Sequence, residues 1–136
     1  MLPLEEIASV PAILSAIETA MANNSQSALK KGPITLEDAT QAAESGDEAV
    51  VGVLQGVAQT LGWVVCQIDA VFNPQKIILA GPLVMFGASL LEPVRKAIGR
   101  FSPQLELPVV VGSELGSFNG ALGAAALALH EWTPKR

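Results

Sequence analysis

The spacing of apolar residues predicts helices over the first half of the chain. Apolar residues recur at helical intervals over residues 13–21, and more densely over Asp47–Phe72. In the second segment they cover more than one face, so we expect this long helix to be largely buried. It should end before Asn73-Pro74, because proline disfavours a helical conformation in the residue that precedes it.

Polar residues predict where these helices start and stop. A turn or two of helix is expected over Leu4–Ala8, and Ser9 should cap the helix that follows. After a polar loop over residues 23–27, another helix should begin at Thr35 and end at Ser45-Gly46. The sequence Ser45-Gly46-Asp47-Glu48 fits a capping box, which would start the long helix.

The pattern changes after Asn73-Pro74. The continuous apolar run Ile77–Leu79 predicts a strand covered on both faces, and residues 108–112 predict a second strand. Residues 83–100 between them have helical spacing, so the strands should pair in parallel through a right-handed crossover. A final helix is expected over 119–132. Two strands are few for so much helix, which indicates part of a larger α/β layer.

Composition fits one compact domain over residues 1–136. The chain is 50% hydrophobic and 15% charged, and its net charge of −5 argues against a surface that binds nucleic acid. No unbroken apolar run reaches the roughly 18 residues of a membrane span, and the acidic start is unlike a signal peptide. We therefore expect a cytoplasmic protein with no membrane or nucleic-acid contact from this segment.

The few cysteine and histidine residues limit metal and redox chemistry. Cys66 is the single cysteine, so no internal disulfide can form, which suits a reducing cytoplasm. His130 is the single histidine and lies far from Cys66 in sequence. These residues cannot assemble a closed metal site, and we expect no metal and no cofactor.

Several short motifs resemble those of the ROK family, which comprises bacterial sugar kinases and sugar-responsive transcriptional repressors. The first motif is Asn73-Pro74, followed by a strand and a glycine turn over 77–83. The others are Leu90-Leu91-Glu92-Pro93, Ser113-Glu114-Leu115-Gly116 and Gly120–Ala125. Their order and spacing span essentially the whole chain. The resemblance implies a carboxy-terminal fragment of an actin-like ATPase (ribonuclease H-like) domain, helix-rich with a short parallel βαβ unit.

The resemblance also implies which family elements would precede residue 1. These are the amino-terminal lobe with its phosphate loop and catalytic Asp, a repressor's winged helix-turn-helix, and most of a zinc-binding loop. Pro3 stands where the last zinc-binding cysteine would be. We therefore expect this chain to be catalytically inactive alone.

By resemblance, three residues are candidates for ligand binding. Glu5 falls where a sugar-contacting carboxylate sits in the family, although it also fits a plain first-turn carboxylate on a solvated helix end. Gly81 and Pro82 fall at the turn that approaches the nucleotide in related kinases. Gly81 would also be needed by a sharp turn alone. Pro82 removes a backbone donor, which argues against kinase-like nucleotide binding, and a Gly-Pro-Leu turn is familiar among the repressors.

Three functions follow from these observations. The favoured function is the ligand-sensing and oligomerisation part of a ROK sugar-responsive regulator, on the evidence of Pro3, Pro82 and the segment Ile34–Gly46. The alternatives are a fragment of an ATP-dependent sugar kinase and a stand-alone helical interaction domain. The expected partner is a second copy, in a homodimer centred on helices, with a sugar bound only in the full-length protein. Small residues at 49, 52 and 56 on the long helix would admit close helix approach.

Overall fold

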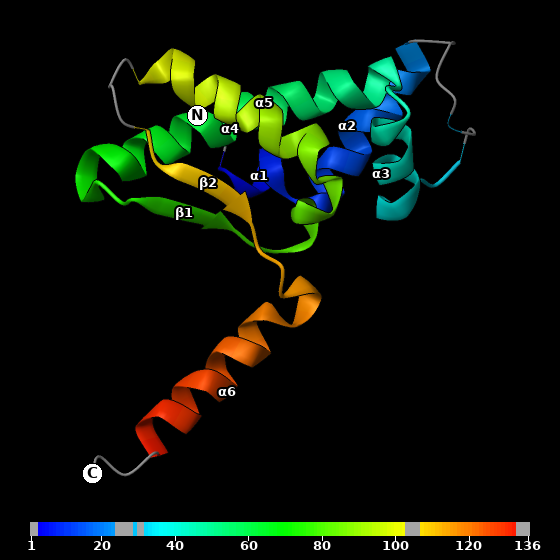
Figure 1. Ribbon diagram of the computed structural model, residues 1–136. Helices are drawn as coiled ribbons and strands as arrows, with labels where there is room; N and C mark the ends of the chain where they lie inside the picture. Colours follow the sequence, from blue (N-terminus) through cyan, green and yellow to red (C-terminus); the bar gives the residue numbers. More distant parts are fainter. Residues whose placement is uncertain (1–2, 24–28, 30–31, 103–106, 133–136) are drawn as a thin grey trace.

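The computed structural model describes residues 3–23, 29, 32–102 and 107–132 (Figure 1). The elements are α1 (Glu5–Ala8), α2 (Val10–Asn23), α3 (Leu36–Glu44), α4 (Glu48–Phe72), β1 (Lys76–Leu79), the 3-10 helix η1 (Pro82–Phe86), α5 (Ala88–Phe101), β2 (Val109–Gly112), the 3-10 helix η2 (Gly116–Phe118) and α6 (Asn119–Trp132). The order of helices and strands predicted from the sequence is confirmed. Most of the loop predicted at 23–27 lies outside the described residues.

The two strands form a parallel pair, as predicted. Ile77 lies opposite Val110, and α5 makes the crossover between the strands. One face of the pair is buried at Val110, which is 2% exposed, whereas Ile78 on the other face is 60% exposed. The prediction that the first strand is covered on both faces is therefore wrong, because the described residues leave the second face in solvent.

Helix α4 is the central element of the fold. It packs against α1, α2, α3 and α5 through a buried face that includes Leu54, Val57 and Val65. Its opposite face and its carboxyl end are exposed, and Phe72 is 75% exposed. The helix is thus buried along one face only, because no described element covers its remaining apolar positions.

Helix α4 also meets the length and composition of a membrane span, which a search for unbroken apolar runs missed. It has 25 residues, and 44% of its most apolar stretch is buried inside the fold. Because α4 carries much of the buried core on one face, a role as a core helix accounts for its apolar character.

Helices α4 and α5 approach each other closely at Gly62. A Cβ atom on Gly62 would lie 2.6 Å from the Cβ atom of Ala97 and 3.2 Å from the backbone nitrogen of Ile98. By contrast, Gly52 and Gly56 have open space where a side chain would stand. Of the small residues expected to admit another helix, Gly52 and Gly56 are therefore uncovered, whereas residue 49 is buried in the chain's own core.

The amino end of α4 differs from the prediction. Asp47, not Ser45, caps the helix, and its carboxylate accepts hydrogen bonds from the backbone N–H groups of Ala49 (3.0 Å) and Val50 (3.3 Å). The Ser45 hydroxyl instead donates to a carbonyl of α3 at 2.9 Å. Gly46 has a φ of +80° and ends α3, which leaves Asp47 to start the next helix.

The helix predicted from residue 83 starts only at Ala88, because the 3-10 helix η1 ends just before Gly87, which has a φ of +51°. The helix starts predicted at Ser9 and Thr35 are confirmed. The Ser9 hydroxyl accepts from the backbone N–H of Ala12 at 3.3 Å. At the start of α3, Thr35 and Asp38 form a reciprocal capping box, each side chain accepting the other's backbone N–H at 3.1 Å. The side-chain hydrogen bond from Thr35 lowers the pKa of Asp38. The resulting stabilisation is present above the ordinary pKa of 3.8 and is lost as the pH falls through the lowered value.

The cap assignment predicts different costs for two neighbouring substitutions. Asp47→Ala should lower the free energy of unfolding by about 1 kcal/mol, because two backbone N–H groups lose their acceptor. Ser45→Ala should change it by less than about 0.5 kcal/mol. Urea unfolding followed by circular dichroism measures both. A larger loss from Ser45→Ala than from Asp47→Ala would show that the box starting at Ser45 is the true cap.

The contact between α4 and α5 predicts opposite effects of the same substitution at two glycines. Gly62→Ala should destabilise the fold by about 1–3 kcal/mol, because the added methyl group collides with Ala97. Gly99→Ala on α5 should stabilise it by up to about 1 kcal/mol, since alanine favours a helix and a Cβ atom there would meet nothing within 4 Å. Thermal unfolding of both variants provides the measurement. Equal shifts in Tm would mean that the close approach at Gly62 does not exist.

Candidate functional site

The turn after β1 has a backbone conformation that requires glycine. Gly81 has φ +103° and ψ −178°, a region that is open essentially only to glycine. A Cβ atom there would meet nothing within 4 Å, so the backbone conformation and not crowding selects the residue. The turn follows the carboxyl end of β1, where the backbone N–H of Ser113 donates to the Leu79 carbonyl at 2.7 Å. This is the edge of a parallel sheet at which ligands commonly bind.

Pro82 limits what this turn can bind. It is the first residue of η1 and has no backbone N–H. The N–H of Val84 is already used, because it donates to the Gly81 carbonyl at 3.2 Å. Phosphate groups bind at helix amino ends through free N–H groups, so this turn offers few of the donors that they need.

Glu5 lies in the first turn of α1, and its side chain is exposed. Helix α1 packs against α2 and α4. Within the described part of the chain, no hydrogen bond or ion pair involves the Glu5 carboxylate. Its placement fits both interpretations made from the sequence, a ligand contact and a solvated helix end.

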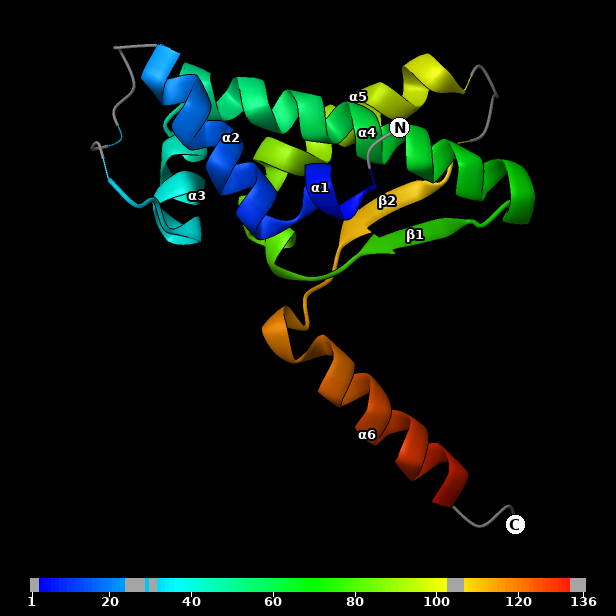
Figure 2. The same ribbon diagram turned by 180° about the vertical axis from the view of Figure 1, so that it is seen from behind.

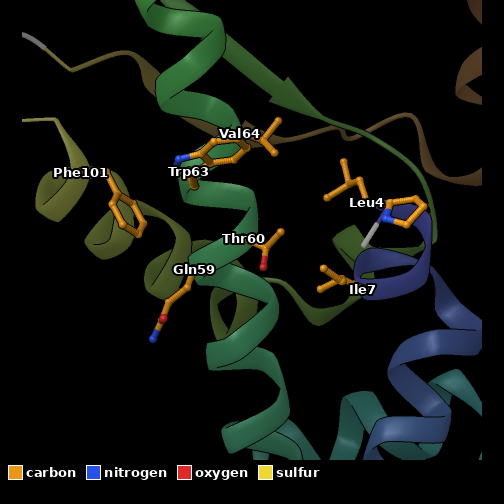
Figure 3. A pocket seen from close by; sticks show the side chains of 8 residues that line it. Leu4, Ile7, Gln59, Thr60, Trp63, Val64 and Phe101 are labelled. Atoms are coloured by element: carbon orange, nitrogen blue, oxygen red, sulfur yellow. The ribbon is translucent and has the colours of Figure 1, made fainter. Parts of the chain in front are cut away.

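An apolar groove beside α1 was missed by the sequence analysis (Figure 3). This Trp63 groove has a volume of ≈ 520 Å³ and is lined by Pro3, Leu4, Ile7, Gln59, Thr60, Trp63, Val64 and Phe101. In Figure 3, Leu4 and Ile7 lie on one side of α4 and Phe101 of α5 lies on the other, with Trp63 on α4 between them. Residues from separate elements form the groove, so no local pattern in the sequence indicates it.

The chemistry of the Trp63 groove suits apolar contact. Among the described residues that line it, the polar groups are the side chains of Gln59 and Thr60 and the indole N–H of Trp63. A sugar site needs several converging polar groups to replace the hydration of the hydroxyls. Neither Glu5 nor Gly81 lines this groove, so the structure does not join it to the predicted sugar and nucleotide positions.

Cys66 lies at the contact between α4 and α5, where its thiol donates weakly to the Ile98 carbonyl at 3.8 Å. Burial, and secondly the charge of Asp69, raise the pKa of the Cys66 thiol, which favours the protonated and less nucleophilic form. His130 lies on the exposed α6. Among the described residues, no three His, Cys, Asp or Glu side chains come close enough to hold a metal ion.

Comparison with known proteins identifies the family. The sequence profile described as "ROK family" matches residues 3–131. The chain is 31% identical to the DNA-binding transcriptional repressor Mlc of Escherichia coli, over 87% of this chain and 30% of that protein. It is 26% identical to a glucokinase of Halalkalibacterium halodurans, over 86% of this chain and 39% of that protein. The chain thus spans about a third of the length of these relatives.

A solved structure agrees with this relationship. The ROK family glucokinase from Streptomyces griseus, in complex with glucose and AMPPNP, superposes with a TM-score of 0.81 at 25% identity. The superposition covers 91% of this chain and 43% of that one. The helix-rich chain with its parallel strand pair is therefore a fragment of the actin-like ATPase fold. The profile match over almost the whole chain and this shared fold show that the chain belongs to the ROK family.

Proposed function

We propose that this chain is the carboxy-terminal, ligand-sensing and oligomerisation part of a ROK-family sugar-responsive transcriptional regulator that acts in the cytoplasm. The observation that carries the proposal is Pro82, placed directly after the glycine turn of β1. The higher identity to the repressor Mlc, 31% against 26% for the glucokinase, supports the same interpretation.

The argument from Pro82 is one of hydrogen-bond donors. Phosphoryl transfer relies on a nucleotide held in position by donors and metal ions, so a kinase gains from every N–H at this turn. Pro82 has none, and the N–H of Val84 is bonded within the turn. A regulator that senses a sugar without transferring phosphate loses nothing by this change.

A sugar kinase is the second candidate. It is favoured by the superposition on a glucokinase whose structure contains glucose and AMPPNP. For both candidates, the chain covers less than half of the length of the proteins it matches. The groups that complete a two-lobed site would therefore belong to protein outside this chain. In such a complete site, we propose that Glu5 contacts the sugar.

The proposal predicts that the purified chain has neither kinase activity nor nucleotide affinity. An assay that couples ADP formation to NADH oxidation should show no turnover of ATP with glucose or N-acetylglucosamine, because the chain spans less than half of the kinases it matches and transfer needs a complete site. AMPPNP should not bind below about 1 mM by calorimetry. Sugar-dependent turnover above background, or micromolar binding of AMPPNP, would contradict the proposal.

The DNA upstream of the Met1 codon separates the two candidates independently of the purified chain. A winged helix-turn-helix encoded there in frame would support the regulator. An Asp-x-Gly phosphate loop without such a motif would support the kinase.

Within this proposal, the exposed face of α4 is the contact between two copies of the chain. Gly52, Gly56 and Trp63 share this face, since they are spaced by four and seven residues. Trp63 is 42% exposed and adjoins the apolar Trp63 groove, while the two glycines leave room for a second helix. Buried aromatic side chains commonly anchor protein interfaces, and two-fold symmetry is the most frequent arrangement.

The dimer proposal predicts a mass near twice the chain mass of 14.1 kDa at micromolar concentration, by light scattering after size exclusion. Gly56→Leu and Trp63→Gln should each weaken the dimer by about tenfold or more, since both act at the centre of the contact. Leu127→Gln on the exposed α6 is the matched control and should leave it intact. A monomeric wild-type chain, or an equal loss of dimer affinity in all three variants, would contradict this proposal.

A further inference from the structure

Helices α4 and α5 form a second pocket, which is polar. This Lys96 pocket has a volume of ≈ 260 Å³ and is lined by Gln55, Gln59, Pro93, Lys96, Ala97 and Arg100. It shares Gln59 with the Trp63 groove, and Figure 3 shows the Gln59 side chain leaving α4 on the side away from Leu4 and Ile7. None of the described residues that line the pocket is acidic.

The spacing of the polar residues explains why they converge. Gln55 and Gln59 are one turn apart on α4, and Lys96 and Arg100 are one turn apart on α5. The close approach of Gly62 to Ala97 holds the two helices together beside them. Two amides from one helix and two cations from the other therefore line one small pocket.

The two cations have no described anionic partner. The nearby carboxylate of Glu92 is engaged by Arg95, whose guanidinium also donates to the Val110 carbonyl at 2.8 and 3.1 Å. Within the residues that the structure describes, Lys96 and Arg100 form no ion pair or hydrogen bond. Like charges one turn apart on a helix repel each other, and a bound anion would relieve this repulsion.

This concentration of positive charge is unusual for the chain. Three of its eight Lys and Arg residues lie on α5, although its net charge is −5. A cation in the last turn of a helix, such as Arg100, is favoured by the helix dipole. The dipole does not account for Lys96 or for the two amides that face them from α4.

We propose that the Lys96 pocket binds the phosphate group of a small metabolite. Ammonium and guanidinium groups form strong, charge-assisted hydrogen bonds with phosphate oxygens. The glutamine amides both donate and accept, which suits hydroxyl groups next to the phosphate. The volume lies below the roughly 300 Å³ at which pockets for drug-sized ligands begin, so a compact phosphate monoester fits better than a nucleoside triphosphate.

This proposal goes beyond the proposed sugar-sensing function, because neither Glu5 nor Gly81 lines the Lys96 pocket. The pocket does adjoin the α4 face assigned above to the dimer. A dimer would cover part of that face, so the test also uses the Trp63→Gln variant, whose substitution lies outside the pocket. The two proposals can then fail independently.

Calorimetry with the full chain and three compounds tests the site. Inorganic phosphate and glycerol 3-phosphate should bind with a Kd below about 1 mM to the wild-type chain, to Trp63→Gln, or to both, whereas glycerol should not bind at that concentration. Raising the potassium chloride concentration from about 20 to about 150 mM should weaken binding, because salt screens exposed charges. Failure of both phosphate compounds to bind below that limit in either protein would overturn the proposal.

Matched variants locate the binding site. Lys96→Gln and Arg100→Gln should each weaken phosphate binding by about tenfold, since each removes one charge-assisted hydrogen bond. Gln55→Glu keeps the side-chain shape and places a negative charge in the pocket, so it should abolish binding. Lys76→Gln removes an exposed cation on β1, outside the pocket, and should change the Kd by less than about twofold. Equal effects of Lys76→Gln and Lys96→Gln would refute the site.

Discussion

The contact between α4 and α5 at Gly62 is the constraint on which the rest of the chain depends. A helix pair can approach this closely only where one partner lacks a side chain, and here the missing Cβ makes room for Ala97. Helix α5 is also the crossover between β1 and β2, so its position on α4 fixes where the strands can pair. Arg95 adds to this link, because its guanidinium joins α5 to the β2 backbone at Val110.

The pattern of apolar residues was sufficient to predict the elements and their order, because helical and strand periodicities are local properties. It could not decide between competing local signals. Ser45 and Asp47 are both suitable helix caps, and the positive φ of Gly46 decides in favour of Asp47. Nor could it tell Gly62 from Gly56, since only the packed structure shows which glycine faces another helix.

The candidate sites divide in the same way. The turn at Gly81 was predictable, because a glycine that follows a buried strand is a local signal with a known place in α/β sheets. The Trp63 groove and the Lys96 pocket were not, because each joins residues from elements far apart in the sequence. The groove has a mostly apolar lining and the pocket a polar one, although Gln59 contributes to both. The elements that surround each cavity, and not any one residue, therefore determine its chemistry.

The residues that the structure describes leave several apolar surfaces uncovered. The second face of the strand pair exposes Ile78, and α6 extends away from the other helices in both views (Figures 1 and 2). Trp132 at its end is 88% exposed. Folded proteins seldom expose apolar surfaces of this size. These exposed surfaces agree with the finding that the chain spans only part of the length of its relatives.

The position of Cys66 gives the chain a built-in chemical probe. Its thiol lies at the contact between the two helices that organise the fold, and its raised pKa lowers its reactivity while they are packed. Because the chain has no other cysteine, alkylation at this one atom would speed up when α4 and α5 separate. A change in the rate of a single covalent reaction would thus report a change in the packing at the centre of the molecule.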